Sequence, residues 1–91
     1  MSAKDKMFQP GAVLHEVIVG AFRSSGTSFE AWCNEQGVHT STARTATYGQ
    51  SGGDKGQALL DQIIDAAGRD VVMLSYKARI TAEAKRLEVA A

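Results

Sequence analysis

Between Phe29 and Tyr48 the chain reads FEAWCNEQGVHTSTARTATY, and this stretch carries the strongest local signals in the sequence. Thr27 and Glu30, which straddle its start, form the pattern of a capping box. In such a box the Thr hydroxyl accepts a hydrogen bond from the amide three residues on, and the Glu carboxylate returns to the Thr amide. A helix therefore starts at this point. It ends at Gly37, because glycine accepts the positive φ of a sharp turn. A further helix follows over residues 39–48, with Thr40 or a neighbour as its N-cap.

The apolar residues of this stretch are spaced so that two short helices pack against each other across the turn. Cys33 lies where the helices cross and must be small, and Val38 is the apolar residue inside the turn. The other inward positions are Phe29, Trp32, Ala43 and Ala46. One face of the helix 39–48 stays free, in a geometry that lets such a helix enter the major groove of DNA.

Helical signals continue on both sides of the stretch. Pro10 can open a first helix, which ends at residues 24–26; its apolar stripe is Leu14, Val17, Ile18 and Ala21, with Phe22 beside it. A glycine-rich loop over residues 50–56 leads into a helix that begins near Asp54 and is broken by Gly68. Its predicted buried face is Leu59, Leu60, Ile63, Ile64 and Ala67.

Asp70 can cap a last helical segment from Val71 to about Glu88. Its apolar residues form a heptad-like seam of Met73, Tyr76, Ile80 and Leu87. A short strand over residues 71–73 is the alternative. The expected fold class is all-α, a compact bundle of about five helices. We expect residues 1–9 to form a flexible N-terminal arm and residues 10–68 a helix-turn-helix DNA-binding domain. Residues 69–91 are expected to form a C-terminal helical segment that either mediates dimerisation or packs on its own core.

Composition limits the class of protein. The 91 residues carry ten Lys+Arg and ten Asp+Glu, so the formal net charge is zero, which argues against a generic polycation. An apolar fraction of 44% fits one globular domain. The single Cys excludes an internal disulfide framework and favours a reducing compartment. No apolar run is long enough for a membrane span, and no apolar block follows the charged residues 1–6, so we expect a cytoplasmic protein.

Residues 14–64 resemble the helix-turn-helix domain of the lambda-repressor-like family of phage and mobile-element regulators. The resemblance lies in the pattern of a preceding helix, the two helices of the motif, a loop and a following apolar helix. Cys33 stands where the family commonly has Ala, Gln36 is polar where an apolar residue is usual, and Ala43 and Ala46 are smaller than the usual branched residues. In this family the second and third residues after the apolar residue of the turn contact base edges, which implies that role for Thr40 and Ser41.

The chemistry of the helix 39–48 agrees with that role. Arg can bond guanine bidentately, and Thr and Ser can donate, accept or contact a thymine methyl group. Residues 36–53 contain no Asp or Glu, so the proposed face lacks acidic residues although the chain is neutral. The candidate DNA-binding residues are His39, Thr40, Ser41, Thr42, Arg44, Thr45, Tyr48 and Lys55. Lys55 and the Gln50–Ser51 loop are candidates for phosphate contacts.

Other functional patterns are weak. Cys33, His15 and His39 lack the spacing of a zinc site, and residues 49–56 do not match a phosphate-binding loop. Asp61 and Asp65 are interpreted as a solvated face. We therefore expect no metal, no cofactor and no enzymatic activity.

The expected function is a sequence-specific transcriptional regulator, a repressor of phage, prophage or mobile-element type. It would bind an inverted repeat in double-stranded DNA as a homodimer, with Met73, Tyr76, Ile80 and Leu87 as the candidate dimer interface. The alternative is a small protein-interaction module, an antirepressor or antiactivator that does not bind DNA.

Overall fold

Helices follow one another through the part of the chain that the computed structural model describes, residues 8–50 and 53–90. They are α1 (Ala12–Ser24), α2 (Phe29–Gln36), α3 (Thr40–Thr47), α4 (Asp54–Ala67) and α5 (Arg69–Ala90). These residues include no strand, so the predicted all-α class is confirmed and the strand alternative for residues 71–73 is wrong. Residues 71–73 instead lie in the first turn of α5.

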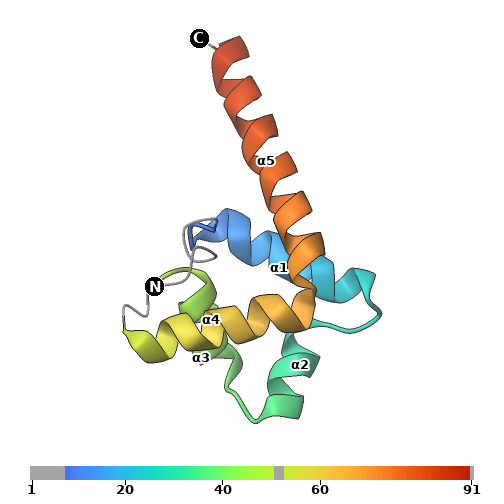
Figure 1. The fold of residues 1–91 in the computed structure, drawn as a ribbon, viewed down its shortest axis with the longest axis vertical. Coiled ribbons are helices and arrows are strands. Elements are labelled where there is room, and N and C mark those ends of the chain that lie inside the picture. The colour runs from blue at the N-terminus through green and yellow to red at the C-terminus, as the bar shows by residue number, and fades with distance from the viewer. Residues whose placement is uncertain (1–7, 51–52, 91) are drawn as a thin grey trace.

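Four helices enclose the core, and the fifth begins in the core and leaves it. The short helices α2 and α3 lie on one side of the globule, and α4 packs against α3 (Figure 1). α5 follows α4 directly, packs against α1 and then projects away from the other helices (Figure 1). The largest fully buried side chains are Phe22, Phe29, Leu14, Ile18, Ile63, Ile64 and Val72.

The N-terminal end of the described chain belongs to the core. Phe8 is buried and its ring contacts that of Tyr76 edge-on at a centroid distance of 5.5 Å. The Gln9 amide donates a hydrogen bond of 3.1 Å to the Tyr76 hydroxyl. These two residues were expected in a flexible arm, but an aromatic ring in contact with α5 removes apolar surface from water. Residues 1–7 of that arm lie outside the described residues.

The start of α2 differs from the predicted capping box by one residue. Ser28 is the N-cap, and its hydroxyl accepts a hydrogen bond of 3.0 Å from the Ala31 amide. The Thr27 amide instead donates to the carbonyl of Phe22 at the end of α1. Glu30 then occupies the second helical position, so it does not complete a capping box with Thr27.

The junction between α4 and α5 is tight and tied by ion pairs. Gly68 has a φ of 104° and is the only residue between the two helices. Arg69 begins α5, so Asp70 lies in the first turn and is not its cap. Arg69 Nε contacts Asp65 Oδ1 at 2.6 Å, and Arg69 Nη2 contacts Asp61 Oδ1 at 3.2 Å. The two carboxylates expected on a solvated face therefore hold α5 against α4.

Candidate nucleic-acid interface

A glycine in the left-handed conformation forms the turn between α2 and α3. Gly37 has a φ of 69°, and the amide of Val38 donates to the Cys33 carbonyl at 2.9 Å. His39 is extended and precedes the first residue of α3. Ala43, Ala46 and Thr47 are buried against the neighbouring helices α1, α2 and α4. The opposite side of α3 faces solvent.

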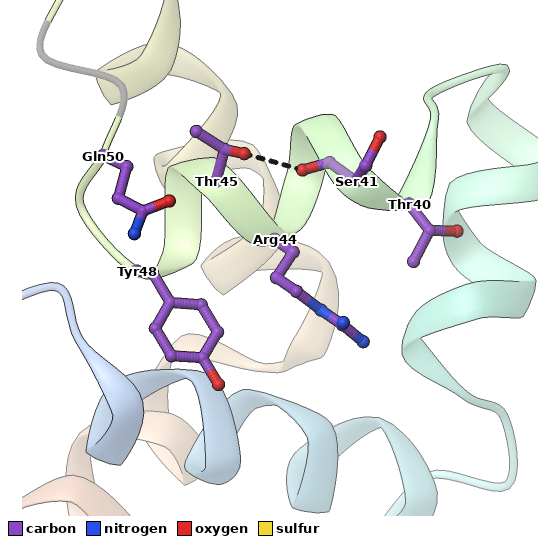
Figure 2. A pocket seen from close by; sticks show the side chains of 6 residues that line it. All are labelled: Thr40, Ser41, Arg44, Thr45, Tyr48 and Gln50. Atoms are coloured by element: carbon purple, nitrogen blue, oxygen red, sulfur yellow. Dashed lines mark hydrogen bonds between the residues drawn. The ribbon is translucent and has the colours of Figure 1, made fainter.

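A shallow groove of about 530 Å³ runs along this exposed side. It is lined by Thr40, Ser41, Arg44, Thr45, Tyr48 and Gln50. Figure 2 shows that Arg44 and the Tyr48 ring extend toward α1, whereas Ser41 and Thr45 lie on the other side of the helix. Five of the predicted DNA-binding residues thus lie around one concavity.

The polar groups of the groove differ in what they can offer a ligand. The Thr45 hydroxyl donates a hydrogen bond of 2.8 Å to the Ser41 carbonyl, so its oxygen remains available mainly as an acceptor. The Arg44 guanidinium and the Ser41 hydroxyl make no hydrogen bond or ion pair with any described residue. A guanidinium carries five N–H donors in a planar fork, which suits guanine edges and phosphates. The groove therefore offers directed donors and no carboxylate.

The remaining predicted residues lie outside the groove. His39 and Thr42 are exposed at the start of α3, and Lys55 is exposed in the first turn of α4. Gln50, expected only as a loop contact to phosphate, is one of the lining residues. Ser51 lies outside the described residues.

Sequence reasoning did not assign His15 to this region. The residue is 8% exposed, and its ring stacks on the Tyr48 ring at a centroid distance of 4.8 Å. His15 Nδ1 lies 2.8 Å from Thr47 Oγ1, and that hydroxyl donates to the Arg44 carbonyl at 2.9 Å. Because the hydroxyl has one proton, Nδ1 is the donor to its oxygen. A signal was present in the sequence, since His15 lies on the inward side of α1 next to Leu14 and Ile18.

The surroundings of His15 favour its neutral form. Burial lowers the pKa of the imidazole below its ordinary value of 6.5, and the nearby positive charge of Arg44 lowers it further. The negative charges of Glu16 and Glu30 act in the opposite direction and are weaker. His15 is therefore a neutral Nδ1–H donor at neutral pH.

The proposed dimer seam is divided between the core and the surface. Tyr76 is buried and Met73 is half-buried against the core of the same chain. Ile80 and Leu87 are 43% and 73% exposed. The four seam residues therefore do not form one free surface.

No described helix combines the length and apolar character of a membrane span, and no three His, Cys, Asp or Glu residues of the described chain are placed to hold a metal ion. Comparison with family models, curated proteins and solved structures returned no match to this chain.

Proposed function

We propose that this protein is a sequence-specific DNA-binding regulator that reads the major groove with α3. The observation that carries the proposal is the exposed side of α3, where Arg44, Ser41 and Thr45 surround one groove without any acidic side chain. The α2–Gly37–α3 arrangement supports assigning a helix-turn-helix, and so supports the repressor type that the sequence resembles.

The net charge of zero agrees with DNA binding that depends more on base contacts than on phosphate contacts. Affinity for DNA of any sequence depends mainly on Lys and Arg contacts to phosphate. Here Arg44 is the one basic residue among the described residues that line the groove. Nonspecific binding should therefore be weak, and base contacts by the residues of α3 should contribute most of the discrimination.

Arg44→Ala tests this directly. The wild-type chain is first used to select duplexes from a random pool at low salt, and affinities are then measured by mobility shift. We expect Arg44→Ala to lose about 1–3 kcal/mol of binding, with the loss confined to one or two base-pair positions of the selected site. Stability should be unchanged, since the side chain is exposed and unpaired among the described residues.

Lys55→Ala is the matched control. If Lys55 contacts phosphate, its removal weakens all duplexes alike and lowers the salt dependence of binding by about one counterion. If the wild-type chain retards no duplex at low salt, the DNA-binding proposal is wrong.

A homodimer belongs to the proposal for a geometric reason. One small domain buries about 600–1,000 Å² on DNA, and a twofold dimer on an inverted repeat doubles the contacts. Ile80 and Leu87 are the seam residues that remain exposed to mediate it.

A second candidate, a protein-interaction module, is favoured by the large apolar side chains exposed on α5. They are Val71, Leu74, Ile80 and Leu87. Failure to retard any duplex would favour this reading.

A further inference from the structure

On the side of α3 that faces the core, Thr47 accepts two hydrogen bonds from the start of α1 and the residue before it. The Gly11 amide donates to the Thr47 carbonyl at 3.0 Å, and His15 Nδ1–H donates to the Thr47 hydroxyl at 2.8 Å. The Thr47 hydroxyl in turn donates a hydrogen bond to the Arg44 carbonyl. α1 thereby contacts the turn of α3 that bears Arg44 and Tyr48, two residues of the groove.

His15 also determines where the Tyr48 ring lies. The two rings stack at a centroid distance of 4.8 Å with an interplanar angle of 30°, and His15 forms a T-shaped pair with Phe29 of α2 at a centroid distance of 5.3 Å. Tyr48 is more than a third exposed, so its free side borders the groove and its other side covers the imidazole. In Figure 2 the Tyr48 ring extends from the end of α3 onto α1. Movement of His15 would therefore move a groove residue.

Protonation of His15 would be energetically unfavourable in its position between α1 and Tyr48. The imidazolium would be buried beneath Tyr48 and close to the positive charge of Arg44. Glu16 from α1 and Glu30 from α2 act in the opposite direction, but burial and Arg44 together outweigh them. A buried charge next to a like charge is unfavourable, and this cost falls if the imidazolium moves out from beneath Tyr48.

We propose that neutral His15 is a positioning residue for the α3 face, and that its protonation releases Tyr48 and lowers the affinity of the chain for DNA. The effect on DNA rests on the proposed function, whereas the release of Tyr48 does not. Linkage gives the direction in which stability changes with pH, because the folded state binds the proton of His15 more weakly than the unfolded chain does. The stabilisation from neutral His15 is thus complete above about pH 6.5 and is lost as the pH falls below it.

The first experiment needs no DNA. The ring signals of His15 and Tyr48 and the Thr47 amide are followed by NMR in the wild-type chain from pH 7.5 to 5.5. We expect Tyr48 and Thr47 to shift with the same midpoint as His15, while signals from the outer turns of α5 stay unchanged. Tyr48 and Thr47 signals that do not follow His15, or loss of the whole folded spectrum over this range, would overturn the proposal.

The second experiment measures affinity for the duplex selected by the wild-type chain at pH 7.5. We expect a severalfold loss between pH 7.5 and 5.5, and no such loss in His15→Gln, whose amide can still donate to Thr47 but does not titrate. His39→Gln is the control, because it removes the other imidazole of the sequence, which lies exposed at the start of α3, and leaves the contact between His15 and Tyr48 in place. We expect this variant to keep the loss of affinity that the wild-type chain shows. An equal loss in His15→Gln and wild type would overturn the proposal. If no duplex is selected, the proposed function fails and the NMR titration still decides whether His15 positions Tyr48.

Discussion

Gly49, two residues after the end of α3, has a conformation that other residues rarely adopt. Its φ is 78°, and a Cβ added there would lie 2.7 Å from Cβ of Pro10. The residue therefore permits two things at once, the left-handed turn after α3 and the close approach of the chain that leads into α1. Gly20 is different, since it lies exposed within α1 and a Cβ there would meet nothing within 4 Å.

These two glycines should respond to Ala with opposite signs. We expect Gly49→Ala to lower the free energy of unfolding by about 1–2 kcal/mol from the backbone conformation alone, with a further loss from the displacement of Pro10. Gly20→Ala should raise it by about 0.5–1 kcal/mol, because Ala is the better helix former. Urea unfolding followed by circular dichroism measures both. A loss of only about 1–2 kcal/mol would show that the contact with Pro10 relaxes freely. A neutral Gly49→Ala would contradict the prediction.

At the scale of the element, the start of α2 shows how a helix boundary is decided. Two neighbouring hydroxyl residues, Thr27 and Ser28, are both suitable caps. The Thr27 amide donates a hydrogen bond to the Phe22 carbonyl near the end of α1, and the Ser28 hydroxyl accepts the hydrogen bond from the Ala31 amide. The connection between α1 and α2 is thus what selects the cap.

Replacing each hydroxyl separately tests this assignment. Ser28→Ala should destabilise the domain by about 0.5–2 kcal/mol, because the Ala31 amide loses its acceptor at the helix end. Thr27→Ala should have an effect below about 0.5 kcal/mol, as is usual for an exposed side chain without a specific contact. Thermal unfolding of the two variants under one set of conditions provides the comparison. The reverse order would restore the capping box that the sequence predicts.

On the scale of the whole molecule, α5 has two parts with different surroundings. The first turns hold Val72 and Tyr76 in the core, and Arg79 Nη1 contacts Glu16 Oε1 of α1 at 3.1 Å. The later turns project from the globule (Figure 1). Deletion of residues 69–91 would therefore remove part of the core as well as any dimer surface, and it cannot test the dimer alone.

Point variants on the projecting part avoid this problem. We expect the double variant Ile80→Ser with Leu87→Ser to sediment as a monomer at concentrations where the wild-type chain is a dimer, with its folded spectrum unchanged. Leu74→Ser is the matched control, because Leu74 is also exposed on α5 but points away from the other two side chains. A wild-type chain that is monomeric, or a double variant that remains a dimer, would contradict the role of this surface.

Local signals account for the parts of the fold that depend on near neighbours in the chain. Apolar spacing predicted the buried faces of α1 and α4, and the glycines at 37 and 68 marked the turns at which α2 and α4 end. Helical periodicity and the φ of a glycine act over a few residues, so the sequence contains them directly. The same holds for the exposed residues of α3, of which Ser41 and Arg44 border the groove.

Contacts between distant parts of the chain were decided by the tertiary structure. Phe8 meets Tyr76 across 68 residues of sequence, and His15 bonds to Thr47 across 32. Periodicity indicates that such side chains face inward, but it does not indicate which of them meet. The sequence by itself thus determined the helices, their turns and the face of α3 that is free of acidic residues. The packing of α1 against α3 placed the His15 ring behind the exposed face of α3. The sequence could not indicate this contact, because its energy depends on the geometry of distant segments, which no local pattern contains.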